Sequence, residues 1–415
     1  MDIKVLLNRC HPIKGFVYDS SWLTEEQTIC LRICTRKGSR GVCLGCGKRA
    51  RTYDTARTPR SFSFIPIWGF AVLLFYCMRR VDCRRCGVTT EMVPWADGKQ
   101  QSCYAYRQFL AFWAKRLSWT EVGRVFHTSW GVVFRSVKWV VDWGLAHRNL
   151  DGVAAIGIDE IAVWKGHKYL TIVYQIDEGF RRMLWVGRDR TEQTLTDFFT
   201  MFGAARAASL RFVASDMWKP YLNIIARFAA GAVHVLDRFH IVAKLNKAID
   251  EIRSDEARRL AAKGYTALKH TRWCFLKRPK NLTPGQKRKL KDVLQYNLRT
   301  VHAYLHREAL EGFWKFRSPL WAGWFLDGWC MRVMRSRIPQ LKKFAQTMRR
   351  HKPLILNWFR AKRLISSAVV ESMNANAKMA IRKARGFRTI EALETALFHQ
   401  LGHLPEPTFS THRFW

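Results

Sequence analysis

Residues 155–163 read Ala-Ile-Gly-Ile-Asp-Glu-Ile-Ala-Val, and this stretch decides which fold we expect for the chain. Apolar, β-branched residues on both sides of two acids are typical of a strand that is largely buried. Two further apolar runs follow at residues 169–176 and 183–186, after short polar turns. Three such runs in quick succession predict an antiparallel meander.

Helix and strand patterns alternate after the meander. Thr191 can cap a helix over residues 191–205, whose large apolar residues share one face. The next elements predicted along the chain are a strand, a helix and a strand, at residues 211–215, 219–228 and 232–236. The order βββαβαβ is that of the RNase H-like fold, whose first and fourth strands are neighbours in the sheet.

Three acids stand in comparable places along this pattern. Asp159 lies in the first strand run, Asp216 directly follows the fourth, and Glu371 lies in a helical stretch much further along. Two Mg²⁺ or Mn²⁺ ions about 3.5–4 Å apart can activate an attacking oxygen and stabilise a leaving oxygen, and such hard ions bind carboxylates. We expect Asp159 to bridge both ions, with Asp216 on one and Glu371 on the other. Each acid alone is more often a cap or turn residue, so the prediction depends on all three together.

Further acids lie close to these three in the sequence. Glu160 is expected on the strand face opposite Asp159, and Asp177 in a turn, so we expect neither in the site. Asp237 and His240 follow the fifth strand, and two interpretations are open for them. They line the catalytic site and position water or the scissile phosphate, or else Asp237 caps a helix and His240 is packed in the protein.

A row of polar residues follows Glu371 at helical spacing. Asn374, Lys378, Arg382 and Arg385 lie roughly on one stripe with Glu371 if the helix continues. A carboxylate followed by these side chains along one helix predicts a metal ligand followed by a clamp for DNA phosphates.

The composition predicts a polyanionic partner. The 415 residues include 71 Lys and Arg but only 32 Asp and Glu, a formal net charge of +39. Because 48% of the residues are hydrophobic and the charge is spread along the chain, a disordered basic tail is excluded. Residues 251–350 alone hold 24 Lys and Arg and 7 Asp and Glu. Their tryptophans are expected mostly in a core, with some stacking on unpaired bases: Trp273, Trp314, Trp321, Trp324 and Trp329.

Two cysteine pairs predict a structural zinc site. Cys43 and Cys46 form one C-x-x-C pair and Cys83 and Cys86 the other, and each pair can supply two of four soft ligands. The alternative is four buried free thiols. The apolar run at residues 62–78 between the pairs is marginal in length for a membrane span, and its Pro and Gly favour strands of a small domain instead. No secretory signal is expected, so the remaining cysteines are expected to stay reduced.

Residues 119–141 predict a helix-turn-helix. One apolar face contains Val122, Val125 and Phe126, the stretch at residues 127–129 breaks it, and a second helix follows a cap at Ser129. The second helix is expected to present three side chains to DNA: Trp130, Arg135 and Lys138. The alternative is an ordinary helical hairpin in a core.

With these pieces in place, the chain resembles a DDE transposase of a bacterial insertion sequence, of the ISL-three family. The resemblance covers nearly the whole length, and its most specific block is Val-Glu371-Ser-Met-Asn374 with Lys378 and Gly-Phe-Arg388. It implies an RNase H-like core with a helical insertion between Asp216 and Glu371, and recognition of terminal inverted repeats by the N-terminal domains. A transposase-derived DNA-binding regulator and a structure-specific nuclease on the same core are the alternatives.

The predicted architecture is a multidomain α/β and α+β chain with five segments. These are a zinc-binding domain, a helix-turn-helix, the first part of the RNase H-like core, a basic helical insertion and the C-terminal core helices with Glu371, at residues 1–100, 101–150, 151–245, 246–353 and 354–415. The expected partners are the element ends and target DNA, with a homodimer or higher oligomer in the synaptic complex and no membrane. The expected location is the bacterial cytoplasm, at the nucleoid.

Overall fold

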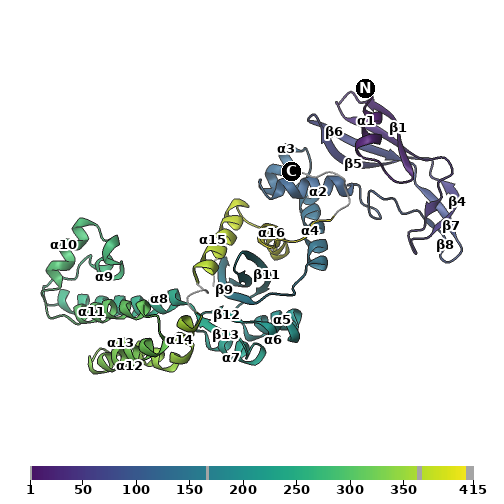
Figure 1. Ribbon diagram of the computed structural model, residues 1–415. Helices are drawn as coiled ribbons and strands as arrows, with labels where there is room; N and C mark the ends of the chain where they lie inside the picture. Colours follow the sequence, from purple (N-terminus) through teal and green to yellow (C-terminus); the bar gives the residue numbers. More distant parts are fainter. Residues whose placement is uncertain (1, 165–167, 362–366, 408–415) are drawn as a thin grey trace. The chain divides into compact units, whose positions relative to one another are not determined.

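The computed structural model describes residues 2–164, 168–361 and 367–407 (Figure 1). The chain divides into two compact units. Unit 1 contains residues 1–149 and 377–415, and unit 2 contains residues 150–376. Helix α15 (Ser367–Lys383) therefore begins in unit 2 and ends in unit 1. Within the described ranges, none of the helices has both the length and the apolar character needed to cross a bilayer.

The N-terminal part of unit 1 contains two four-stranded sheets and one short helix, α1 (Ile3–Cys10). The first sheet has the order β1 (Phe16–Leu23), β2 (Ile29–Thr35), β6 (Phe70–Tyr76) and β5 (Arg60–Ile67). The second has the order β3 (Gly41–Val42), β4 (Arg49–Thr55), β7 (Arg79–Cys83) and β8 (Gly87–Thr90). The apolar run at residues 62–78 thus forms strands, as predicted.

Helices complete unit 1. They are α2 (Tyr104–Ala114), α3 (Trp119–Val125), α4 (Trp130–His147) and α16 (Ile390–Leu401). Ala392 and Ala396 of α16 belong to the same hydrophobic cluster as Val133 and Val137 of α4. We expected all residues from 354 onward in the catalytic core. Instead, α16 packs with the N-terminal helices, because its apolar face is buried against theirs.

Unit 2 is built on a mixed five-stranded sheet with the order β11-β10-β9-β12-β13. Its strands are β9 (Ala155–Trp164), β10 (Lys168–Asp177), β11 (Phe180–Arg188), β12 (Phe212–Ser215) and β13 (Val233–Leu236). The first three pair antiparallel, whereas β12 runs parallel to both β9 and β13. The predicted order of strands is confirmed, and the first and fourth strands are neighbours. The single helix predicted over residues 191–205 is two helices instead, because the chain turns at Gly203, whose φ is +91°.

Helices lie on both faces of this sheet. On one face, α5 (Glu192–Phe202) and α7 (Lys219–Phe228) share a core with the side chains of Ile156 and Ile158; the short α6 (Ala204–Ser209) follows α5. On the other face, Gly157 lets α15 come close, because a Cβ at this position would lie 2.4 Å from Cγ2 of Val370. Alternate residues of β9 therefore face α15 and the α5/α7 layer.

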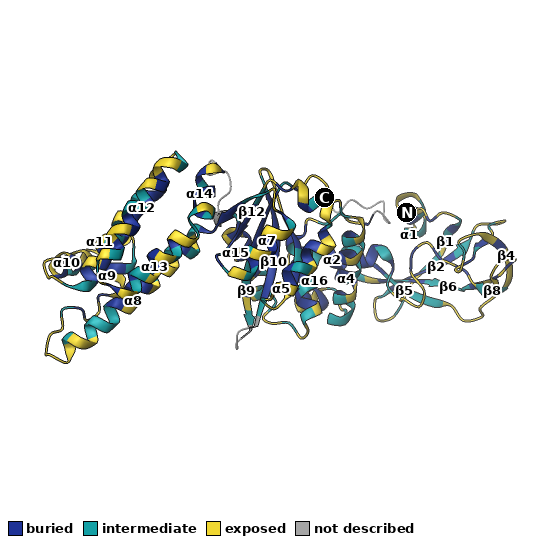
Figure 2. Cartoon of the chain, turned by 90° about the horizontal axis from the view of Figure 1, so that it is seen from below, coloured by how far each residue is buried: buried dark blue, intermediate teal, exposed yellow. Residues whose placement is uncertain are grey.

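The remainder of unit 2 is helical, as predicted for residues 241–350. Its α-helices are α8 (Arg238–Ala261), α9 (Arg272–Leu276), α10 (Pro284–Val293), α11 (Arg299–Glu311), α12 (Pro319–Arg335), α13 (Pro339–Arg350) and α14 (Lys352–Arg360). Buried and exposed residues alternate along α8, α12 and α13 (Figure 2), as expected of amphipathic helices. Trp314 and Trp329 are buried in this core, whereas Trp273, Trp321 and Trp324 are more than half exposed.

Candidate active site

Asp159 lies in the middle of the sheet of unit 2, on the face of β9 that meets α15. Its side chain is 14% exposed. Oδ1 accepts a hydrogen bond of 2.8 Å from the backbone N–H of Glu160, and Oδ2 accepts one of 2.5 Å from the side-chain amide of Asn374. Both oxygens of the first predicted metal ligand therefore have protein donors.

Asn374 lies on α15, one turn after Glu371, and is buried. The hydroxyl of Tyr174 donates to its Oδ1 at 2.8 Å, which turns its NH₂ group towards Asp159. We expected Asn374 on a stripe of DNA-binding side chains. The structure places its amide inside the protein, where it connects the helix of Glu371 to the strand of Asp159.

The rest of the expected stripe is interrupted by the end of the helix. Lys378 and Arg382 are exposed on α15, but the helix ends at Lys383. Arg385 follows in a left-handed conformation with φ +54°, so it does not continue the helical row.

Asp216 follows directly after β12 and interacts with residues on the opposite face of the sheet. Its Oδ1 accepts from the backbone N–H of Trp218 at 2.8 Å, and Oδ2 lies 2.5 Å from Nη2 of Arg190. Nε of Arg190 lies 3.0 Å from Oε1 of Glu160. One guanidinium group therefore donates a hydrogen bond to Asp216 and forms an ion pair with Glu160, in which Nε and Oε1 are close but not aligned for a hydrogen bond.

Glu160 was expected outside the site because it points away from Asp159. It does face the α5/α7 layer, yet Arg190 joins it to Asp216 there. Burial, and then the negative charge of Asp216, raise the pKa of Glu160 to about 7. No motif or spacing marked Arg190 in advance, since it lies in the polar link between β11 and α5.

Asp237 has the capping role that one interpretation predicted, and His240 lies close to Asp159. Asp237 caps α8, because its carboxylate accepts from the backbone N–H of Phe239 at 2.7 Å. Nε2 of His240 also lies 3.6 Å from Asp237 and 3.8 Å from Asp159. The nearby Asp159 raises the pKa of His240 above its usual value, with Asp237 adding to this effect while burial opposes it.

Glu371 completes the predicted set from α15. Burial, followed by the negative charges of Asp237 and Asp159, raises the pKa of Glu371, whereas His240 lowers it. Carboxylates are therefore crowded here with incomplete compensation, which a hard divalent cation would relieve. Nevertheless, within the described ranges, the only group of three or more such ligand atoms that all lie within 4.8 Å of one another is formed by four cysteines. The oxygens of the three acids do not all approach one another this closely.

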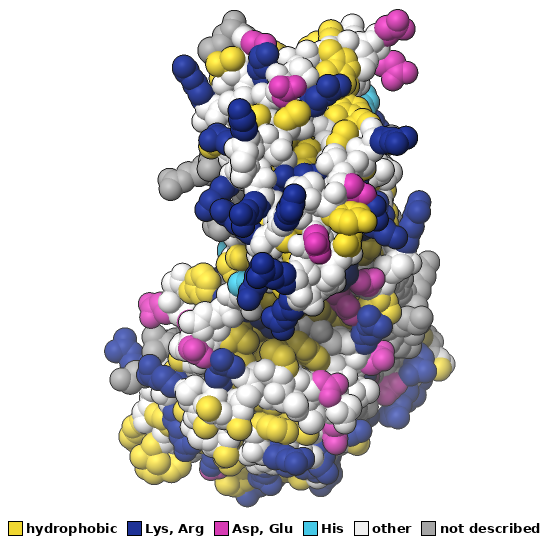
Figure 3. Space-filling model, turned by 90° about the vertical axis from the view of Figure 1, so that its right-hand side faces the viewer, with side chains coloured by type: hydrophobic (Ala, Val, Ile, Leu, Met, Phe, Trp, Pro, Cys, Tyr) yellow, Lys and Arg dark blue, Asp and Glu magenta, His cyan; other side chains and the backbone are white. Residues whose placement is uncertain are grey.

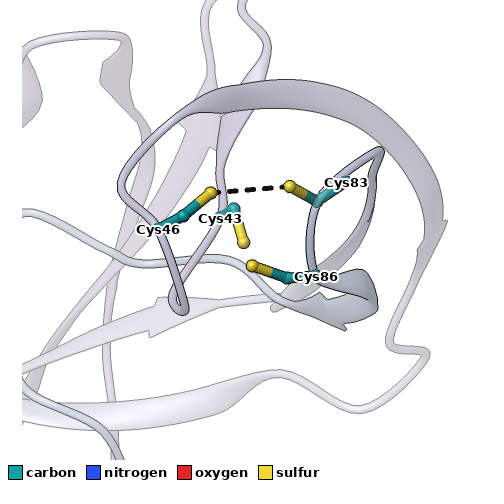
Figure 4. A group of neighbouring side chains, drawn as sticks. All are labelled: Cys43, Cys46, Cys83 and Cys86. Atoms are coloured by element: carbon teal, nitrogen blue, oxygen red, sulfur yellow. Dashed lines mark hydrogen bonds between the residues drawn. The ribbon is translucent and has the colours of Figure 1, made fainter.

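Those cysteines form the candidate metal centre of unit 1 (Figure 4). Cys43 and Cys46 lie at the turn between β3 and β4, whereas Cys83 ends β7 and Cys86 lies in the turn before β8. Their sulfur atoms all lie within 4.8 Å of one another, with 3.5 Å between those of Cys46 and Cys83. Backbone N–H groups of Arg85 and Cys86 lower the pKa of Cys83 to about 7, which favours the thiolate. This donor set fits zinc.

The two helices of the predicted DNA-reading motif are well defined. A capping box between Ser118 and Glu121 begins α3, and Ser129 caps α4. A Cβ at Gly123 would lie 2.8 Å from the carbonyl oxygen of Thr128, so the tight turn requires glycine. The prediction that Val125 belongs to the apolar face was wrong: it is 54% exposed, because α3 ends there.

The three side chains expected to face DNA differ in their surroundings. Arg135 is exposed. Trp130 is half-buried and stacks on Phe134 with ring centroids 5.3 Å apart. Lys138 pairs with Asp142 at 3.0 Å and with Glu391 at 3.2 Å, so its charge is already compensated.

Comparisons with known proteins identify the family to which the chain belongs. A family model described as a transposase, of the DDE ISL-three type, matches residues 156–397. The transposase for insertion sequence element IS1001 of Bordetella parapertussis is 29% identical over 354 residues, which cover 84% of this chain and 86% of that protein. The transposase for insertion sequence element IS1557 of Mycobacterium tuberculosis is 29% identical over 421 residues, covering 95% of this chain and 93% of that protein. Because the family match spans more than half of the sequence, the chain belongs to the ISL-three family of DDE transposases.

Proposed function

We propose that this transposase binds the terminal inverted repeats of an insertion sequence and uses a metal-dependent DDE site on an RNase H-like core to cut and join DNA. It nicks the element ends, and each exposed 3′-OH then attacks a target phosphodiester. One observation carries the proposal. Asp159 lies on β9, Asp216 directly follows the neighbouring parallel strand β12, and α15 brings Glu371 close enough for Asp159 to raise its pKa.

Asp159, Asp216 and Glu371 are the residues that would hold the cations. Two bound Mg²⁺ or Mn²⁺ ions would supply a deprotonated attacking oxygen and stabilise the leaving oxygen. Asn374 orients the Asp159 carboxylate through its hydrogen bond. The pKa of His240 is raised beside Asp159 and Asp237, which favours its protonated form, and that form can donate a hydrogen bond to a phosphate oxygen.

The other basic and aromatic side chains fit DNA as the partner. Lys and Arg side chains are spread over the face drawn in Figure 3 and do not gather in one patch. Lys378 and Arg382 are exposed for phosphate contacts, and Arg135 for contacts by α4. Among the tryptophans of the helical part, the exposed Trp273, Trp321 and Trp324 can reach DNA, whereas the two buried ones serve the core.

The zinc site, the assembly of several chains and the location in the cell complete the proposal. We assign structural zinc to the four cysteines of unit 1, whose turns the ion would hold together. Two element ends must be cut in one complex, so we propose a homodimer or higher oligomer for synapsis. A protein acting in this way works at the bacterial nucleoid.

Cleavage of labelled element ends in Mg²⁺ tests the proposal. Asp159→Ala and Glu371→Ala should each retain binding of the ends and abolish both nicking and strand transfer. Asp197→Ala, on the exposed face of α5, is the matched control and should remain active. Strand transfer that survives either catalytic substitution would refute the DDE assignment.

The same assay separates the two alternatives. A regulator would protect the inverted repeats without cutting them, and a structure-specific nuclease would cut branched DNA regardless of the repeat sequence. Cleavage mapped to the element ends, with a footprint on paired repeats, is the result expected of a transposase.

A further inference from the structure

The bridge formed by Arg190 connects a proposed metal ligand to an acid outside the DDE set. Nη2 of Arg190 lies 2.5 Å from Asp216, and Nε lies 3.0 Å from Glu160. The side chains of both acids are largely shielded from water, with 14% and 9% exposed, so these charges interact more strongly than surface charges do. Asp216 is therefore already neutralised by a cation that belongs to the protein.

The position of Arg190 is fixed by the backbone on both sides. Asp189 before it has φ +67°, and its backbone N–H donates to the carbonyl of Tyr169 at 3.0 Å. Thr171 donates its hydroxyl to the carbonyl of Asp189 at 2.8 Å, and Thr191 after it caps α5. The guanidinium carbon lies 4.6 Å from the centre of the Trp218 ring. A side chain held by a ring and two carboxylates is part of a built arrangement.

We propose that Arg190 is a built-in counter-ion that occupies Asp216 until a divalent metal replaces it, and that Glu160 retains Arg190 after the exchange. This inference rests on the proposed function, since it takes Asp216 to be a metal ligand. Arg190 is accordingly a positioning residue, and Glu160 holds it near the site.

The exchange predicts opposite effects for the two partners. In Arg190→Gln, the incoming metal has no cation to displace and meets two uncompensated carboxylates, so its affinity should rise about tenfold. In Glu160→Gln, Arg190 is no longer shared and pairs with Asp216 alone, so metal affinity should fall by a similar factor. If Arg190 and Glu160 had only a structural role, the two substitutions would not change the metal affinity in opposite directions.

Isothermal titration calorimetry of the full-length, zinc-loaded protein with Mn²⁺, without DNA, measures these affinities directly. Arg206→Gln is the matched control, because Arg206 forms an exposed ion pair of 2.7 Å with Asp151 in the same unit, and it should bind Mn²⁺ as the unmodified protein does. Asp216→Asn should lose the binding event.

The outcomes distinguish this inference from the proposed function. If Asp216→Asn binds Mn²⁺ like the unmodified protein, the metal-dependent DDE site itself is refuted. If Asp216→Asn loses binding but Arg190→Gln binds no more tightly than the unmodified protein, only the counter-ion role is refuted. If circular dichroism shows that Arg190→Gln does not fold, Glu160→Gln decides, and unchanged or tighter binding by that variant overturns the inference.

Discussion

Asn374 illustrates how one buried amide can connect two parts of a catalytic site. Its side chain has a single good orientation, because Tyr174 donates to its oxygen and leaves the NH₂ group to face Asp159. A carboxylate held in this way keeps one rotamer before any cation arrives. The same residue type on the surface would be free to contact DNA, so burial alone decides its role here.

Asn374→Ala should lower end cleavage by about tenfold to a hundredfold, as is usual for residues that orient a metal ligand. It should also lower the free energy of unfolding by about 1–3 kcal/mol, because it leaves a buried oxygen of Asp159 without a donor. Single-turnover cleavage and urea unfolding measure the two effects. The exposed Asn223→Ala on α7 is the control, and equal activity of the two variants would contradict the positioning role.

His234 makes the stability of unit 2 sensitive to acid. Its Nε2 lies 2.7 Å from the hydroxyl of Ser215, next to Asp216, and burial lowers its pKa to about 4. The unfolded chain takes up a proton near pH 6.5, whereas the folded chain resists until about pH 4. Stability is therefore complete above pH 6.5 and declines as the pH falls towards 4.

At pH 5, this one group should cost about 2 kcal/mol of unfolding free energy relative to pH 7. His234→Gln retains a partner for Ser215 but cannot be protonated, so its stability should decline less between the two pH values. Urea unfolding at both pH values measures the difference. The exposed His302→Gln should behave like the unmodified protein, and an unchanged pH dependence in His234→Gln would contradict the explanation.

At the scale of elements, the close approach of α15 to β9 depends on Gly157. A Cβ there would meet Val370 at 2.4 Å, only one residue before Glu371. The helix that carries the third acid can therefore approach the sheet only because the strand lacks a side chain at this point.

Gly157→Ala should push α15 outward, lower the unfolding free energy by about 1–3 kcal/mol and reduce end cleavage. Adding Val370→Ala should restore part of both, since it frees the space that the new methyl group needs. Gly231→Ala, whose Cβ would meet no atom within 4 Å, is the control. A double variant no better than the single one would show that the contact is not the cause.

Helix α4 offers a second comparison at this scale, between two cations on one helix. Arg135 is exposed, whereas Lys138 already has Asp142 and Glu391 as partners. Arg135→Ala should weaken binding of the element ends and reduce the slope of log affinity against log salt by about one, whereas Lys138→Ala should change little. Fluorescence anisotropy over a range of salt concentrations measures both, and equal losses would contradict the assignment.

At the scale of the whole molecule, the four cysteines join segments of unit 1 that are about forty positions apart in the sequence. Purified protein should contain about one zinc ion per chain, and Cys83→Ser should lose it and destabilise the N-terminal sheets. Elemental analysis and thermal melting measure these effects. Cys77→Ser, half-buried outside the cluster, should retain the metal. Full zinc content in Cys83→Ser would refute the site.

Local pattern was sufficient to predict much of this molecule. The spacing of the cysteines identified the candidate metal centre, and periodicity gave the strands of the five-stranded sheet close to their true bounds. Asp159 and Asp216 could be predicted as metal ligands because the order of elements makes the strand of Asp159 and the strand before Asp216 neighbours. These features can be predicted from the sequence because each depends on residues a few positions apart or on the order of elements.

Tertiary structure alone decided the rest. Asn374 meets Asp159 across 215 positions, and Arg190 joins Glu160 to Asp216, so no local pattern could reveal either contact. Helix α16 packs with the N-terminal helices because its apolar stripe, which the sequence shows, is matched there by a stripe about 260 positions earlier. The sequence determined which side chains were available for chemistry, and packing determined which of them meet, since burial and partnership depend on the whole chain.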